Sequence, residues 1–98
     1  MEFKLESTNW SNKDELLGRY GALLSEFDIR REVSDRGPYY DELYITFNNL
    51  DELMHLVGAI DRNIGIILFG DSEVYDNNTK QWIPTGIPMI EIYDGYRE

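Results

Sequence analysis

The chain has 98 residues and a net charge of −10, with 19 acidic and 9 basic side chains. Its hydrophobic content of 42%, including 13% aromatic residues, provides enough apolar surface to offset the entropy lost on folding, which excludes a disordered chain. Cysteine is absent, so disulfides, thiolate metal sites and cysteine nucleophiles are excluded too. We therefore expect one acidic globular domain spanning residues 1–98, in a reducing cytoplasm.

The first 27 residues predict a strand followed by a helix. Apolar and charged residues alternate over residues 2–7, which is typical of a half-buried strand. Ser11 and Asp14 form an acidic variant of the capping box, and Gly18 and Gly21 suggest a close approach of the helix to the sheet. The helix is expected over about 12–26, with apolar positions at Leu16, Leu17, Tyr20, Leu23, Leu24 and Phe27.

The middle of the chain predicts a hairpin and a second helix. Alternating residues over 27–33 and 43–47 flank the turn signal 34–38. Asn49 then suits an N-cap, with Glu52 in the reciprocal position. The helix that follows is expected to carry one apolar stripe made of Leu50, Leu53, Met54, Val57 and Ile60.

The last third predicts strands. Residues 64–69 are apolar on both faces, as in a central strand. Residues 74–75 and 81–83 suggest a short hairpin, and residues 89–93 alternate as a final strand. The first six elements match the ferredoxin-like β-α-β-β-α-β pattern, with two helices on one face of an antiparallel sheet. We expect that α+β core with the hairpin and last strand appended, a fold that hosts many functions.

Residues suited to catalysis or metal binding are few. His55 has no cysteine or elbow serine to activate, so we expect it at the surface. The loop containing Asp71, Glu73 and Asp76 offers oxygen ligands, but Tyr75 stands where an EF-hand-like loop needs an acidic or amide residue. The expectation is therefore no catalytic residue, no metal and no cofactor.

Membrane and nucleic-acid binding are also disfavoured. The N-terminus lacks the basic segment and apolar run of a signal peptide, and the run 64–70 is far shorter than the roughly 20 residues that span a bilayer. No phosphate-binding glycine motif occurs. The C-terminal tyrosines lie among acids rather than the basic residues that a nucleic-acid reader needs. Neither a membrane nor a nucleic acid is an expected partner.

The charge is uneven along the chain. Residues 1–36 hold eight acidic and six basic residues, a net of −2, whereas residues 37–98 hold eleven and three, a net of −8. Tyrosines provide contact area and carboxylates pair with Arg and Lys, so acidic segments rich in tyrosine suit docking on a basic protein. Simple solubility is the alternative reading. The candidate partner-binding residues are Asp41, Glu42, Asp71, Glu73, Tyr75, Asp76, Glu91, Tyr93, Asp94 and Tyr96.

Two segments carry a family resemblance. Residues 90–98, together with residues 49–54 leading into the strand 64–67, resemble small hypothetical proteins of phages and prophages of low-GC Gram-positive bacteria. The resemblance covers about half of the chain, and such families have no agreed activity. It implies a setting in which small acidic proteins often inhibit host defence proteins, CRISPR effectors among them, by occupying their nucleic-acid-binding surfaces.

The expected function is therefore that of a non-enzymatic, acidic protein-binding module. As a phage-type inhibitor and DNA mimic, for example an anti-CRISPR protein, it would cover a basic groove on a nucleic-acid-binding enzyme in the host cytoplasm. Two alternatives stay open. One is a structural protein that forms a homodimer or larger homo-oligomer through strand 89–93, and the other is a small enzyme that uses carboxylates.

Overall fold

A computed structural model describes residues 1–7, 12–59 and 64–94; for residues 64–69, 93 and 94 it describes the backbone alone. The predicted strands and helices are confirmed, and the fold is α+β with two helices. The elements are β1 Glu2–Ser7, α1 Lys13–Leu24, β2 Asp28–Glu32, β3 Glu42–Thr46, α2 Leu50–Ala59, β4 Ile64–Phe69, β5 Glu73–Asp76, β6 Gln81–Pro84 and β7 Met89–Asp94.

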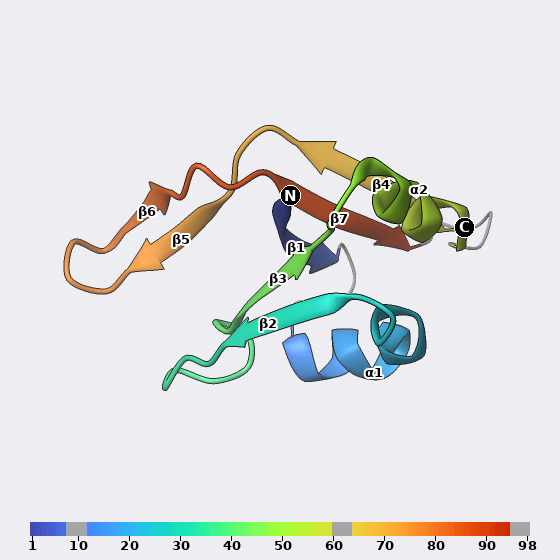
Figure 1. Cartoon of the computed structure of the whole chain (residues 1–98). Coiled ribbons are helices and arrows are strands. Elements are labelled where there is room, and N and C mark those ends of the chain that lie inside the picture. The colour runs from blue at the N-terminus through green and yellow to red at the C-terminus, as the bar shows by residue number, and fades with distance from the viewer. Residues whose placement is uncertain (8–11, 60–63, 95–98) are drawn as a thin grey trace.

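Five strands form one mixed sheet in the order β2-β3-β1-β7-β4 (Figure 1). Strand β1 runs antiparallel to β3 and parallel to β7, and Lys4 lies opposite Tyr44 on one side and Met89 on the other. The predicted antiparallel ferredoxin-like sheet is therefore wrong. In that fold the strand after the second helix pairs with the first strand, whereas here β7 lies between them. It does so because β4 and β7 pair with each other along their whole length.

The position of β7 between β1 and β4 corrects two further predictions. Strand β4, expected to be central, lies at an edge of the sheet and pairs with β7. Strand β7, expected at an edge, is hydrogen-bonded to β1 on one side and β4 on the other. A strand that is paired on both sides has no free backbone groups for a second copy. The predicted edge position of β7, on which a homo-oligomer through this strand was based, is therefore wrong.

Both helices pack on one face of the sheet. Helix α1 has its apolar positions against the core as predicted, whereas α2 buries Leu53 and Leu56 and leaves Leu50, Met54 and Val57 exposed. The buried side of α2 is therefore turned from the predicted stripe toward Leu56, which was not part of it; Ile60 is outside the described residues. The core is Leu5, Leu16, Tyr20, Leu24, Leu43, Ile45, Phe47, Leu53, Leu56, Ile90 and Ile92.

Local signals at the helices are partly confirmed. The Asn49 side chain accepts from the Glu52 N–H at 3.0 Å, as expected of an N-cap. The cap of α1 is Asn12, which accepts from the Asp14 N–H at 2.9 Å, rather than Ser11, which lies outside the described residues. A Cβ atom at Gly18 or Gly21 would meet nothing within 4 Å. The predicted close approach to the sheet is wrong for both glycines.

The hairpin β5–β6 forms a separate two-stranded sheet that projects from the body, and we call residues 71–87 the arm (Figure 1). Its base is closed by a polar network: the Thr85 N–H donates to the Ser72 carbonyl at 2.9 Å, and the Ser72 hydroxyl donates to the Ile87 carbonyl at 2.7 Å. Two strands alone are marginally stable, so these bonds and contacts with the body hold the arm. No helix in the described part of the chain is long and apolar enough to span a membrane.

Candidate partner-binding face

The face of the sheet opposite the helices carries most of the charged strand residues, and we call it the open face. Residues paired across strands share a face, so the registers place alternate residues of β1, β2, β3 and β7 there. Its described side chains are Glu2, Lys4, Glu6, Asp28, Arg30, Glu32, Glu42, Tyr44, Thr46, Met89 and Glu91. Six carboxylates against two cations leave a net charge of −4 among these described residues.

Lys4 lies at the centre of the open face. Its side chain is only 6% exposed, and its Nζ lies 2.8 Å from Glu42 Oε1 and 3.5 Å from Glu6 Oε2. It also donates to the Glu73 carbonyl of the arm at 2.5 Å. The Glu42 Oε1 atom is buried and lacks a hydrogen bond with suitable geometry among the described residues. Burial raises the pKa of Glu42, and the Lys4 ammonium offsets this only in part.

Arg30 covers the β2 side of the open face. Its guanidinium lies 4.2 Å from the ring centroid of Tyr44 and forms ion pairs with Glu2 at 3.1 Å and with Glu32. The stacked guanidinium leaves Tyr44 only 4% exposed. This part of the face is therefore charged at its surface and aromatic beneath.

Glu91 is the carboxylate that most clearly experiences the surplus of negative charge. It lies opposite Glu6 in the register of β1 and β7, and no ion pair to it occurs among the described residues. Its pKa is raised by burial first and by the charge of Glu6 second. A cation from outside would offset the repulsion from Glu6 and favour the charged form of Glu91, which makes this part of the face a favourable contact for Lys or Arg.

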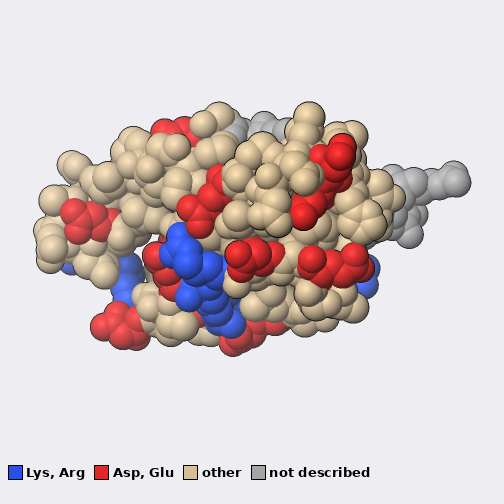
Figure 2. Space-filling model, in the orientation of Figure 1, with Lys and Arg blue, Asp and Glu red and all other residues tan. Residues whose placement is uncertain are grey.

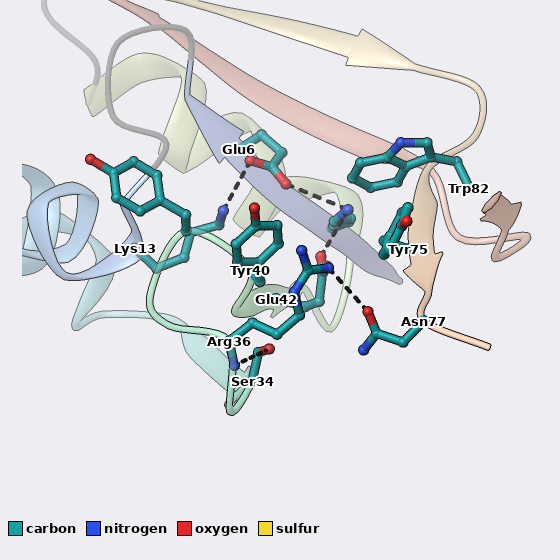
Figure 3. Close-up of a pocket in the computed structure, with 11 residues that line it drawn as sticks. Glu6, Lys13, Ser34, Arg36, Tyr40, Glu42, Tyr75, Asn77 and Trp82 are labelled. Carbon is teal, nitrogen blue, oxygen red and sulfur yellow. Dashed lines mark hydrogen bonds and ion pairs between the residues drawn. The ribbon is translucent and has the colours of Figure 1, made fainter. Parts of the chain in front are cut away.

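A cleft of about 220 Å³ separates the arm from the body. In Figure 2 the surface is hollowed there, and acidic side chains are spread over the visible face while most basic ones gather beside the hollow. Figure 3 shows Glu6 and Glu42 on its floor, Tyr40 and Arg36 on the body side, and Tyr75 and Trp82 on the arm. The structure thus brings the tyrosine-rich segment 39–42 and the arm together, although 30 or so residues separate them in the sequence.

Asp41 has a structural role that excludes it from a docking surface. The residue is 3% exposed, and its carboxylate accepts from the Ser34 N–H at 2.7 Å and from Arg31 Nε at 2.9 Å. The backbone hydrogen bond and then Arg31 hold the pKa of Asp41 below its usual range. The expectation that Asp41 contacts a partner is wrong, because its oxygens already bind the β2–β3 connection.

Two of the predicted residues of the arm, Asp71 and Asp76, bind backbone and side-chain groups within the arm. The Asp71 carboxylate accepts from the Ser72 and Gly86 N–H groups at 2.8 and 3.1 Å. Asp76 accepts from the Asn78 N–H at 2.9 Å and from the Thr79 hydroxyl at 3.0 Å. These two acids shape the turns of the arm.

The other predicted residues have varied settings. Glu73 is exposed, and Tyr75 packs edge-on against Trp82 with ring centroids 5.3 Å apart. Of Tyr93 and Asp94 only the backbone at the end of β7 is described, and Tyr96 lies outside the described residues. Of the ten predicted residues, Glu42 and Glu91 therefore lie on the open face, and Asp71, Glu73, Tyr75 and Asp76 lie on the adjoining arm.

Sequence reasoning missed the basic residues that organise this region. Lys4, Arg30 and Arg36 were not singled out, although the alternation over 2–7 already placed Lys4 with Glu2 and Glu6 on one face. His55 is exposed, as predicted, with its Nε2 3.1 Å from Glu26 Oε1. Among the described side chains, no three His, Asp or Glu residues are placed to hold a metal ion.

Comparisons with protein families, with curated proteins and with solved structures found no match to this chain. The chemistry of the open face, the arm and the cleft is therefore the basis for a functional proposal.

Proposed function

We propose that this chain is a non-enzymatic protein-binding module whose open face docks on a basic surface of a partner protein. The observation that carries the proposal is the charge of that face: six carboxylates against two cations, on the side of the sheet opposite α1 and α2. Such a surface attracts basic partners over the Debye length and repels nucleic acid.

Exposed aromatic side chains beside the cleft provide apolar contacts in addition to the charge of the open face. Trp82 is 56% exposed and Tyr39 is 63% exposed, on opposite sides of the cleft. Trp, Tyr and Arg dominate the binding energy of protein interfaces when they are buried by a partner. Carboxylates that steer the encounter and aromatic side chains that hold the complex are thus adjacent.

The partner best suited to this arrangement is a basic host protein, for example a nucleic-acid-binding enzyme whose groove is covered. A twisted sheet face with spaced carboxylates offers such a groove the charge that a nucleic-acid backbone would offer. An inhibitor of phage type, with anti-CRISPR activity as one case, is the biological form of this mechanism.

The test compares two variants that lose the same charge. In the face variant, Asp28, Glu32 and Glu91 become Asn, Gln and Gln; in the control, Glu15, Asp35 and Asp51, which are exposed and lie outside the strands of the sheet, become Gln, Asn and Asn. Proteins captured from a bacterial lysate are identified, and one basic partner is purified for titration. We expect the face variant to lose at least about tenfold in affinity, as removal of contacting charges does, and the control to lose little.

Salt and competition complete the test. Affinity of the wild type should fall steeply from 0.1 to 1 M salt, as the Debye length shortens from about 10 to about 3 Å. The partner should also lose its nucleic acid when this protein saturates it. Equal losses for face variant and control would refute docking through the open face, and undisturbed nucleic-acid binding would refute the mimic mechanism.

A further inference from the structure

Arg36, in the connection between β2 and β3, lies at the cleft and contacts both the body and the arm (Figure 3). Its Cζ atom lies 4.0 Å from the ring centroid of Tyr40 and 5.2 Å from that of Tyr75, and its Nη1 donates to Asn77 Oδ1 at 3.0 Å. One ring belongs to the body, while the other ring and the amide belong to the arm. These three contacts orient the guanidinium at the cleft, and a group that is already oriented loses less entropy on binding.

The ion pairing of Arg36 differs from that of its neighbours in the sequence. Arg30 pairs with Glu2 and Glu32, and Arg31 pairs with Asp41. No carboxylate in the described part of the chain forms an ion pair with Arg36. In a chain with 19 acidic and 9 basic residues, Arg36 is thus a positive charge that has no counter-ion among the described side chains.

The rest of the cleft is electrically balanced. Lys4 and Lys13 face Glu6 and Glu42 on its floor, with a Lys13–Glu6 distance of 3.3 Å in addition to the Lys4 pairs. Two cations and two carboxylates sum to zero, and Arg36 adds one positive charge. The cleft thus has a net charge of +1 within a protein of net charge −10, which favours a monoanion.

The volume of the cleft and the residues that line it further limit the class of ligand that fits. The volume of about 220 Å³ is below the roughly 300–1,000 Å³ of ordinary organic-ligand pockets, so the cleft suits a single small group. A planar guanidinium matches a carboxylate with two parallel hydrogen bonds. The rings of Tyr39 and Trp82 lie around the same cleft and can pack on an apolar body attached to that carboxylate.

We propose that the cleft is a binding site for a carboxylate with an aromatic or apolar body, which pairs with Arg36. The carboxylate belongs either to a small free acid or to an acidic side chain of a protein partner, and both present the same chemistry. This proposal does not depend on docking through the open face, because the cleft would bind an anion whereas the open face would bind a basic protein.

The test is an NMR titration of labelled protein at 0.15 M salt, where the Debye length of about 8 Å screens the net charge. One arm uses 3-phenylpropionate, and the other uses the blocked peptide acetyl-Phe-Glu-Phe-amide, whose sole carboxylate is a side chain. We expect saturable shifts of the Arg36 Nε–H and Trp82 indole N–H signals. The tighter ligand identifies the source, and failure of both overturns the proposal.

Two controls separate charge recognition from general stickiness. The uncharged analogue 3-phenylpropionamide should bind at least about tenfold more weakly to the wild type, because it lacks the charge-assisted hydrogen bonds; equal binding of acid and amide overturns the proposal without any variant. Arg36→Gln should weaken the acid by a similar factor, whereas Arg30→Gln, which changes another arginine stacked on a tyrosine, should leave it within about twofold. Unchanged affinity in Arg36→Gln would also overturn it.

Discussion

The two faces of the central sheet carry side chains of opposite character: one is apolar and buried, and the other is charged and partly exposed. On the helix side, Leu5, Leu43 and Ile90 are fully buried. On the other side their immediate neighbours Glu6, Glu42 and Glu91 are partly exposed carboxylates. Burial of apolar area supplies most folding free energy, whereas partly exposed ion pairs supply little. One face can therefore change its charge in evolution or in the laboratory while the other keeps the fold.

The largest expected effect is on the helix side. Leu43→Ala removes a fully buried side chain between the sheet and the helices and should lower the free energy of unfolding by about 2–5 kcal/mol. Glu32→Gln, on the exposed side of the paired strand β2, should change it by no more than about 0.5 kcal/mol. Urea unfolding followed by circular dichroism measures both, and similar losses would contradict the division between the faces.

An intermediate effect is expected at Asp41, where a carboxylate is buried like a core residue. Its pKa is lowered in the fold, so its stabilising contribution is present above the ordinary value and lost as pH falls through the lowered pKa. Asp41→Asn should be less stable than wild type at pH 7, and the difference should shrink in acid. Asp35→Asn, at an exposed position of the same connection, should show no such trend in thermal unfolding between pH 7 and 3.

The smallest change in stability is expected at Glu91, where removal of the carboxylate charge should stabilise the fold rather than destabilise it as at Asp41. The pKa of Glu91 is raised, so the folded state binds its proton more tightly than the unfolded state does, and that advantage is lost as pH rises through the raised pKa. Glu91→Gln should therefore raise the melting temperature slightly at pH 7, with no gain below the ordinary value of 4.5. A destabilised variant at pH 7 would mean that Glu91 makes a favourable contact inside the fold.

These predictions also show how far the sequence alone could reach. Alternation over 2–7 correctly identified β1, and Asn49 correctly marked the start of α2. The candidate residues Glu42 and Glu91 were found from acidity and neighbouring tyrosines, and both lie on the open face. Asp41 was chosen by the same signal but is buried, because acidity does not reveal that Arg31 and Ser34 bind it.

The order of the strands could not be read in the same way. Both β4 and β7 have strand patterns, but the pattern of one strand does not say which strands lie beside it. Their pairing as the two sides of a long hairpin placed β7 next to β1 and left β4 at the edge. The cleft, with Arg36 between Tyr40 of the body and Tyr75 of the arm, follows from that arrangement, since the arm is the segment between β4 and β7.

The sequence by itself determined the elements, the acidic charge and the division of each strand into an apolar and a charged side, because these depend on neighbours a few residues apart. The tertiary structure alone decided which strands are adjacent, which carboxylates accept internal hydrogen bonds and which charged side chains line the cleft together. Those outcomes depend on contacts between residues that are distant in the chain, and such contacts form only when the whole core is packed.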